Sequence, residues 1–323
     1  MRVLNVVLFC IFNTILCFAQ QPSQYTLHSL NLAALNPAYA GIEPFFQANA
    51  LVRHQWNGLS GSPQSQILNV NLPIKSISSG AGINIENDQL GLQQTIQASL
   101  CYSYHLRLNR VNLLSFGLRG GFGQMGWNGT NIRTPDGKYL NAGIDHKDEI
   151  LPSVFFSGRF PVLDAGLLYQ RNFVKLGIGI KNLTQNSIKY TINNGKIRLV
   201  TNYFFTFATE IEIREQYKVM PSVLFRTDLA ESQLDVTLIS ELYRKFNVGV
   251  GYRGWSNLSN DALSLIAGFR LNEKIRLIYS YDINLSPLKS SNNGSNELML
   301  QYNLNKSIGK AIPERIIYNP RYF

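Results

Sequence analysis

The sequence predicts an all-β protein, a transmembrane antiparallel up-and-down β-barrel of about fourteen strands. The segment Thr95–Leu108 alternates apolar and polar residues without a break, as a strand with one apolar and one polar face does. It is also longer than the nine to eleven residues, roughly, that a tilted strand needs to cross a bilayer. Segments with the same period of two recur along the chain, and no apolar run after the first residues is long enough for a spanning helix.

A long strand of a soluble β-sandwich would show the same alternation, and this alternative stays open on one segment alone. Tyr102 and Tyr104 near one end of the segment resemble an interfacial aromatic girdle, which favours a membrane barrel. The connections favour it as well. Those after odd-numbered strands are expected to be long and those after even-numbered strands short, as extracellular loops and periplasmic turns are. This parity places both termini in the periplasm.

The first nineteen residues have the pattern of a secretory signal peptide. Arg2 precedes an apolar stretch that ends at Ala19, a small residue before a plausible cleavage site. Residues 1–19 are therefore excluded from the fold. Removal of the signal leaves Cys101 as the single cysteine, so we expect no internal disulfide. An exported, disulfide-free β protein fits the bacterial outer membrane.

Residues 20–44 do not alternate and contain the motif LNPAYAG, Leu35 to Gly41. Pro37 has no backbone donor and restrains Asn36 to an extended conformation, so the motif is a poor ladder strand. Leu35 and Tyr39 offer side chains for burial. We expect this segment in the periplasm or packed into the lumen as a plug.

Residues 45–304 contain the segments expected to form the barrel, and residues 305–323 a basic periplasmic tail. The sixth segment has the weakest alternation, and twelve or sixteen strands remain alternatives. The segments are Phe45–Trp56, Ser65–Ile74, Gly80–Asp88, Thr95–Leu108, Asn112–Gly123, Phe160–Arg171, Phe173–Leu183, Leu199–Ile213, Lys218–Arg226, Leu234–Leu242, Phe246–Arg253, Asp261–Leu271, Ile275–Ile283 and Glu297–Leu304.

Four charged residues near strand ends are expected to point into the lumen at the outer mouth. Their apolar neighbours set the lipid-facing parity, which leaves Arg226, Asp235, Arg253 and Asp282 facing inward. Counting from the turns places Arg226 opposite Asp235, Asp235 opposite Arg253, and Asp282 level with Ser264. The alternating signs predict a ladder of ion pairs inside the barrel wall.

The formal charge of +10 is concentrated on the short turns and the tail. A basic collar there could meet an acidic partner or lipid head groups, or simply be solvated. It lacks interleaved aromatic residues, so the sequence does not support nucleic-acid binding.

The sequence shows no convincing catalytic or metal site. None of the four histidines has a metal-ligand spacing with Cys or another His. Ser103 and His105 share one face of a strand and could form a nucleophile and base, but no acid is placed near them. We therefore expect no enzyme activity and no cofactor. A barrel hydrolase remains the third alternative, after a passive porin or uptake channel.

Two segments, Ser23–Gly41 and His54–Gln66, carry the NPAYAG and QWNG motifs, and the chain resembles the PorP/SprF family of Bacteroidetes outer-membrane proteins. Weaker similarities occur later, for example at Met220–Arg226. One departure is Asn296, which stands where the family tends to have His, so a role for that His is in doubt here.

The resemblance implies a non-enzymatic barrel of type IX secretion and gliding motility that assists secretion or surface anchoring of cargo. It implies as partners secreted cargo with a type IX C-terminal signal domain and periplasmic or outer-membrane type IX components, besides the lipid. For partner contact we expect the long outer loops and, by number, Asn36, Pro37, Tyr39, Gly41 and Trp56.

Overall fold

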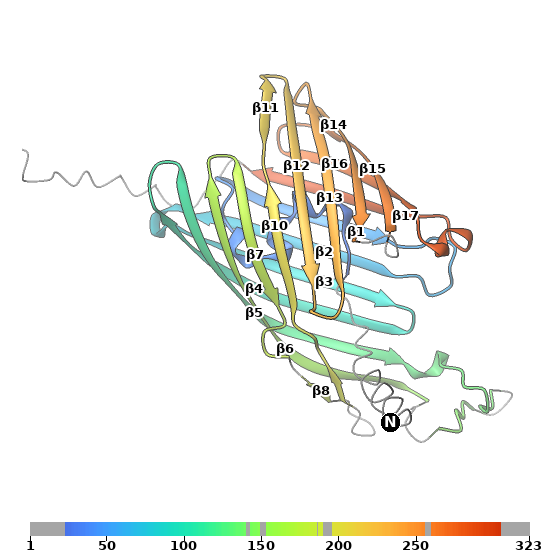
Figure 1. The fold of residues 1–323 in the computed structure, drawn as a ribbon. Coiled ribbons are helices and arrows are strands. Elements are labelled where there is room, and N and C mark those ends of the chain that lie inside the picture. Colours follow the sequence, from blue (N-terminus) through green and yellow to red (C-terminus); the bar gives the residue numbers. More distant parts are fainter. Residues whose placement is uncertain are drawn as a thin grey trace, which may run out of the picture.

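A computed structural model describes residues 23–139, 143–148, 153–185, 187–189, 196–255 and 260–304. The predicted signal peptide (1–19) and basic tail (305–323) lie outside these ranges. Figure 1 shows the arrangement of the elements. Among the described residues, no helix has the length and hydropathy needed to cross a membrane.

The strands form one large antiparallel sheet and a small separate hairpin. The hairpin consists of β8 and β9, and the other strands belong to the large sheet. The strands are β1 (Phe46–His54), β2 (Gln64–Ile74), β3 (Ser79–Leu90), β4 (Gln93–Arg107), β5 (Asn112–Asn128), β6 (Phe155–Arg171), β7 (Val174–Lys181), β8 (Ser187–Lys189), β9 (Lys196–Arg198), β10 (Asn202–Ala208), β11 (Ile211–Arg214), β12 (Tyr217–Thr227), β13 (Ser232–Leu242), β14 (Phe246–Gly254), β15 (Asn260–Arg270), β16 (Ile275–Asn284) and β17 (Ser295–Leu304).

The large sheet closes on itself, because β1 pairs with both β2 and β17. β10 and β11 are consecutive segments of one interrupted strand, and both pair with β12. In the described part of the chain the barrel therefore has 14 strands, which confirms the predicted number. Closure gives every wall strand a neighbour on both sides except at β11, which pairs with β12 alone. A closed wall satisfies the backbone groups that a bilayer cannot.

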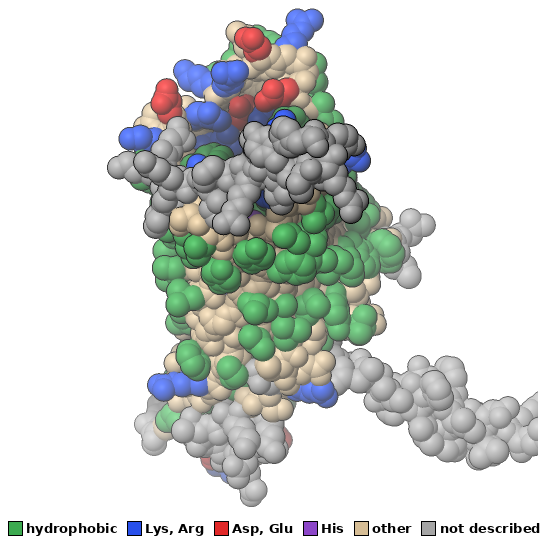
Figure 2. Space-filling view, turned by 90° about the vertical axis from the view of Figure 1, so that its left-hand side faces the viewer, with side chains coloured by type: hydrophobic (Ala, Val, Ile, Leu, Met, Phe, Trp, Pro, Cys, Tyr) green, Lys and Arg blue, Asp and Glu red, His purple; other side chains and the backbone are tan. Residues whose placement is uncertain are grey.

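The two faces of the wall follow the predicted parity. On β4, Leu100 is 66% exposed, whereas its neighbours Ser99 and Cys101 are buried. Phe122 on the adjacent strand β5 is 78% exposed. Figure 2 shows hydrophobic side chains around the middle of the outer surface, with charged side chains toward the two ends. An apolar belt bounded by polar ends is the outer surface of a transmembrane barrel.

The connections follow the expected long and short parity less strictly than predicted. The longest connection joins β5 to β6. The connections expected to be short are short, namely those after β2, β4, β6, β11, β13 and β15. However, β3 and β4 extend toward each other until only Gly91 and Leu92 separate them, where a six-residue loop was expected. Gly91 adopts a positive φ of 59°, which permits this tight turn. The third connection is thus a hairpin turn.

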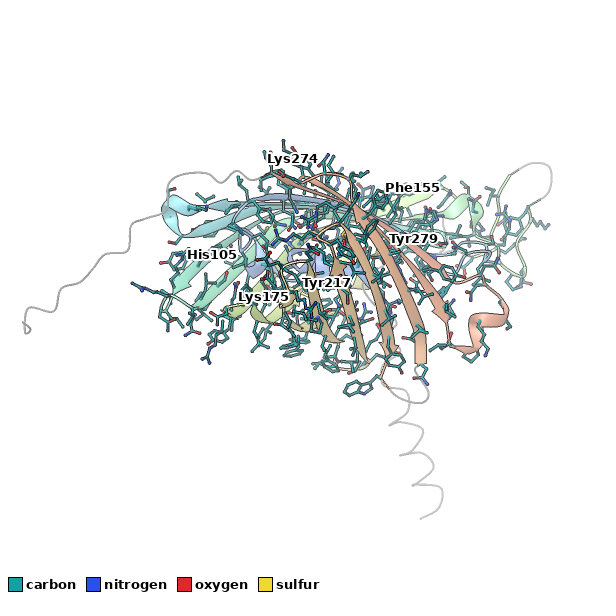
Figure 3. All side chains as sticks on the ribbon, turned by 90° about the horizontal axis from the view of Figure 1, so that it is seen from above. His105, Phe155, Lys175, Tyr217, Lys274 and Tyr279 are labelled. Carbon is teal, nitrogen blue, oxygen red and sulfur yellow. The ribbon has the colours of Figure 1, made fainter. Side chains whose placement is uncertain are left out.

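Residues 23–41 lie inside the barrel, and we call them the plug. They form three short helical turns, η1 (Thr26–Leu30), α2 (Leu32–Leu35) and η2 (Pro37–Tyr39). Figures 1 and 3 show these turns within the ring of strands. Of the two placements that the sequence allowed, periplasm or lumen, the structure has the lumen.

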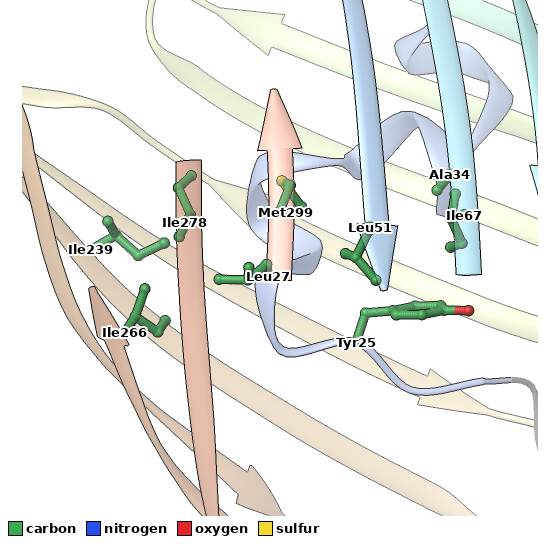
Figure 4. Close-up of a cluster of buried hydrophobic side chains, with 9 residues drawn as sticks. All are labelled: Tyr25, Leu27, Ala34, Leu51, Ile67, Ile239, Ile266, Ile278 and Met299. Carbon is green, nitrogen blue, oxygen red and sulfur yellow. The ribbon is translucent and has the colours of Figure 1, made fainter. Parts of the chain in front are cut away.

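The plug packs on an apolar patch of the inner wall, which was expected to be polar. Tyr25, Leu27 and Ala34 of the plug belong to one buried cluster with residues from six strands (Figure 4). This patch removes apolar plug surface from water, a gain of roughly 25 cal/mol per Å². The wall residues are Leu51, Ile67, Ile239, Ile266, Ile278 and Met299.

Candidate functional site

The Asn36 side chain ties the plug to two neighbouring strands. Its Nδ2 donates to the carbonyl oxygen of Leu167 on β6 at 3.0 Å and to that of Ile178 on β7 at 3.1 Å. Its Oδ1 accepts from the backbone N–H of Ala38 at 2.9 Å and so begins η2. Pro37 follows at the first position of this turn, where its missing N–H costs nothing. Asn36 is therefore a structural anchor of the motif.

Further hydrogen bonds fix the end of the motif. The Tyr39 hydroxyl lies 3.0 Å from Thr206 Oγ1 on β10. Ser115 Oγ on β5 donates to the carbonyl oxygen of Ala38 at 2.8 Å. With the bonds of Asn36, four neighbouring strands therefore hold the NPAYAG motif against the inner wall.

Glycines on the wall make room for the same motif. A Cβ added at Gly117 would overlap the backbone of Pro37 and Ala38, and one added at Gly166 would overlap Asn36. A Cβ at Gly80 would overlap the backbone of Ala40. The plug backbone can approach the strands this closely only because these positions carry no side chain.

Ser103 and His105, the candidate nucleophile and base, both bind the plug. Their Oγ and Nε2 atoms lie 2.9 Å apart, within hydrogen-bonding distance. Ser103 Oγ donates to the carbonyl oxygen of Ala40 at 2.6 Å, and His105 Nε2 lies 3.0 Å from the same oxygen. Ser103 is fully buried. The plug backbone therefore occupies the place where a substrate carbonyl would have to sit.

A buried charge cluster holds the other end of the plug. The carboxylate of Glu297 on β17 accepts the backbone N–H groups of Thr26 and Leu27 at 2.8 and 2.9 Å. Thr26 Oγ1 donates to Asp282 on β16 at 2.9 Å. Arg53 on β1 donates to Glu297 at 2.8 Å and to Asp282 at 2.6 Å. These charged groups are almost completely buried, so each needs its partners.

The predicted ladder of Arg226, Asp235, Arg253 and Asp282 continues this cluster. Arg253 Nε lies 2.5 Å from Asp235 Oδ1, and Arg253 Nη1 lies 3.4 Å from Asp282. Arg226 Nη2 lies 3.1 Å from Asp235. All four side chains are buried within the barrel. With Arg53 and Glu297, which sequence reasoning did not assign to the ladder, the cluster contains three arginines and three carboxylates.

The pairing of the ladder strands was predicted correctly in two cases and wrongly in one. Asp235 is opposite Arg253, and Asp282 is level with Ser264, as expected. Arg226 is opposite Gln233, and Asp235 is opposite Leu224, so the expected pairing of these strands is wrong by two residues. The long Arg226 side chain spans the offset and still reaches Asp235.

His28, in the first turn of the plug, is fully enclosed. Its Nδ1 lies 3.1 Å from the carbonyl oxygen of Tyr25. Burial lowers the pKa of His28, and repulsion from Arg253 and Arg226 adds to this effect, while Asp235 and the Tyr25 carbonyl partly offset it. The docked plug therefore favours a neutral imidazole, with Nδ1–H as the donor to Tyr25.

Two cavities in the lumen border the plug. A cavity of about 620 Å³ lies toward the connections after β1, β3, β5, β7, β12, β14 and β16 and is lined by residues such as Trp56, Asp88 and Asp261. A second, of about 780 Å³, lies toward the short turns and is lined by residues such as Arg244 and Arg276. No described residue lines both. We call them the long-loop cavity and the short-turn cavity.

The residues expected to contact partners fall into two groups. Asn36, Pro37, Tyr39 and Gly41 are buried within the plug. Trp56 is half-buried and lines the long-loop cavity, with its backbone N–H donating to Ser295 Oγ at 3.1 Å. Tyr39 is 7% exposed and lines the short-turn cavity. Partner contact by these residues stays a prediction, and Trp56 is the member of the set that lines the long-loop cavity.

Some anchors of the plug were missed from the sequence. Arg119 on β5 donates to the carbonyl oxygen of Ala34 at 3.0 Å and pairs with Asp164 at 3.1 Å. The sequence does contain a hint of this ion pair, because Arg119 and Asp164 lie at inward-facing positions of neighbouring strands. No sequence rule tells an ion pair that holds a plug from one that only stiffens the wall.

The described residues contain no cluster of three or more His, Cys, Asp or Glu side chains that could hold a metal ion.

No curated protein matches the chain. Among solved structures, the barrel is similar to the monoaromatic hydrocarbon channel CymD (TM-score 0.49, 12% identity, covering 89% of this chain and 94% of that one). It is also similar to the Ralstonia pickettii toluene transporter TbuX (0.48, 10%, 88% and 94%) and to a Pseudomonas aeruginosa FadL homologue (0.47, 11%, 84% and 93%). Similarity at this level does not indicate what this chain does.

A family model described as type IX secretion system membrane protein PorP/SprF matches residues 17–302. The match covers most of the chain, including the plug, and agrees with the resemblance of the NPAYAG and QWNG segments. With the closed barrel and its apolar belt, it identifies an outer-membrane protein associated with type IX secretion. The chain belongs to the PorP/SprF family of type IX secretion system membrane proteins.

Proposed function

We propose that this protein is a plugged, non-enzymatic barrel that assists secretion or surface anchoring of type IX cargo by binding the cargo and periplasmic type IX components. The observation that carries this proposal is the fixed plug. Anchors for residues 23–41 come from strands around the barrel, among them Arg53 on β1, Ser103 on β4 and Glu297 on β17. A passive pore needs a continuous lumen, and a plug anchored inside the barrel supports a closed one instead.

The two cavities suit a protein that meets partners on both sides of a membrane. Each is bordered by part of the plug, the long-loop cavity by Ser23 and Gln24 and the short-turn cavity by residues 29–33. We assign the long-loop cavity to the cell surface and the short-turn cavity to the periplasm, which follows the topology expected from the sequence. The cavities would then present polar surfaces to cargo on one side and to periplasmic components on the other.

Co-purification tests the proposal. The tagged protein, extracted from its native outer membrane in a mild detergent, should retain secreted cargo with a C-terminal signal domain and periplasmic type IX components. Trp56→Ala should lose cargo, since Trp56 lines the cavity assigned to the surface. Trp255→Ala is the matched control, because Trp255 is 56% exposed and does not line either cavity. Recovery of the barrel without either class of partner would contradict the proposal.

A further inference from the structure

An unused hydrogen-bond acceptor lies in the wall of the long-loop cavity. Gln233 on β13 donates from Nε2 to the carboxylate of Asp261 on β15. Because a carboxylate only accepts hydrogen bonds, this contact fixes the orientation of the amide and makes Oε1 the remaining acceptor. Gln233 is only 7% exposed, and its Oε1 atom is buried and has no hydrogen-bond partner among the described residues. A buried acceptor without a donor is costly, so a donor that reaches Oε1 would be favoured there.

Asp261 forms no ion pair with another residue in the described part of the chain. Arg226 of the buried charge cluster interacts electrostatically with Asp261, but its guanidinium pairs with Asp235 at 3.1 Å. The carboxylate of Asp261 instead accepts a hydrogen bond from the neutral Gln233. A donor that enters here should therefore be cationic.

A second carboxylate of the same kind lies elsewhere on the cavity wall. Asp88 on β3 accepts from the hydroxyl of Ser65, a neutral donor. The lysine on this side, Lys181, lies 3.7 Å from Glu86 instead. Overall, the described lining of the cavity contains six acidic and three basic residues. This excess stands out in a chain with a formal charge of +10. Walls of one sign in a cleft concentrate ligands of the opposite sign.

We propose that the long-loop cavity binds a basic peptide segment, with a Lys ammonium or Arg guanidinium donating to both Gln233 Oε1 and Asp261. Its volume of about 620 Å³ is within the usual range of ligand sites. Such a cation supplies the donor that Gln233 lacks and the charge that Asp261 lacks. A Ca²⁺ ion, which takes about six to eight oxygen ligands, would be poorly served by this pair. The source of the segment, a secreted partner protein, rests on the proposed function, while the site rests on its own geometry.

Peptide binding to the full-length barrel in detergent micelles tests this inference. The probe is a blocked Gly-Lys-Gly-Lys-Gly peptide, followed by isothermal titration calorimetry, and the same peptide with acetylated lysines is its control. We expect the charged peptide alone to bind, more weakly as salt is raised. Asp261→Asn and Asp88→Asn should each weaken binding by about tenfold, the size of one charge-assisted hydrogen bond. Asp136→Asn should leave it unchanged, since Asp136 is exposed and does not line the cavity.

Only variants that keep the gel mobility of the folded barrel are compared, so misfolding does not decide the outcome. Equal binding of the acetylated peptide, or equal affinity of wild type and Asp261→Asn, would overturn the inference. Binding of CaCl₂ without binding of the peptide would overturn it as well and would indicate a metal site. Peptide binding by a barrel that retains no type IX partner would contradict the proposed function and leave the cation site standing.

Discussion

The carboxylate of Glu297, on the last strand, accepts the backbone N–H of Thr26, in the first turn of the plug, at 2.8 Å. Glu297 is 1% exposed and is separated from Thr26 by 271 residues in sequence. The contact joins the end of the barrel to its plug, and Arg53 balances the charge of Glu297 at 2.8 Å. Plug docking and barrel closure therefore share one buried charge cluster.

Glu297→Gln should loosen the plug while the barrel stays folded. The substitution leaves three buried arginines facing two carboxylates, and breaking a buried pair costs roughly 3–5 kcal/mol. Because the amide keeps one acceptor, we expect a loss of about 3 kcal/mol in plug docking, within that range. A protease should then cut residues 23–41 on the order of 100-fold faster than in the wild type.

Glu212→Gln is the matched control, because Glu212 lies on β11 with a side chain that is 64% exposed. Exposed ion pairs contribute roughly 0–1 kcal/mol, so the cutting rate should hardly change. Equal rates for Glu297→Gln and the wild type would show that the buried cluster does not hold the plug.

Gly117→Ala should displace the plug, whereas Gly120→Ala on the same strand should be tolerated. A Cβ at Gly117 would overlap the backbone of Ala38, while one at Gly120 would meet nothing within 4 Å. Overpacking of this kind costs about 1–3 kcal/mol. Protease cutting of residues 23–41 again measures it, and similar rates for the two variants would mean that the close approach to Gly117 is not needed.

Leu100→Arg should destabilise the barrel in a lipid bilayer. Leu100 lies at the middle of β4 on the outer face, where an arginine costs roughly 2–4 kcal/mol. The control is Gln97→Arg, which lines the long-loop cavity and is opposite Glu86. The urea midpoint in lipid vesicles should fall for Leu100→Arg and change much less for Gln97→Arg. Equal shifts would argue against the assignment of the lipid-facing side.

Plug docking should weaken in acid through His28. Burial holds the pKa of His28 in the docked plug below its ordinary value, which is about 6.5 in a released segment. The released form therefore binds the proton more tightly, so the docking free energy is fully present above about pH 6.5 and is lost as the pH falls toward the lower, docked pKa. Protease cutting of the plug should accelerate over this range.

His28→Asn should flatten this pH dependence because it removes the titrating group. His54→Asn should retain it, since His54 is exposed at the end of β1. A wild-type cutting rate that stays constant from about pH 7.5 to about pH 5, a range that includes the ordinary pKa of histidine, would exclude the His28 effect.

The strands could be predicted because the period of two is a local signal. The segment expected at Thr95–Leu108 is β4, Gln93–Arg107, and all fourteen expected segments correspond to wall strands. The first part of β6, Phe155 to Arg159, was missed since it does not alternate. This part of β6 is a strand because it pairs with the end of β5, where Phe156 is opposite Trp127.

The pairing of Arg226 was misjudged because of a turn. Asp228 accepts the backbone N–H groups of Ala230 and Glu231 at 2.9 and 2.7 Å. This side-chain bond tightens the connection and moves its centre by one residue, which changes the pairing of the strands by two. A count from the middle of the connection cannot include such a bond.

The plug could be recognised from the sequence but not placed. Its docking depends on Gly80, Gly117 and Gly166, which lie on three strands and are far apart in sequence. Each of these glycines alone is an ordinary strand glycine. Their common purpose emerges only when closure of the barrel brings them to the same side of the lumen.

Single-channel conductance in planar bilayers tests the central claim, that the plug closes the lumen, most directly. The wild-type barrel should show no steady large pore, because residues 23–41 are anchored inside the barrel. Leu35→Ala combined with Tyr39→Ala should open one, since these changes remove a buried packing contact and the hydrogen bond to Thr206. A steady large conductance from the wild-type protein, unchanged in the double variant, would contradict the account and indicate a passive porin.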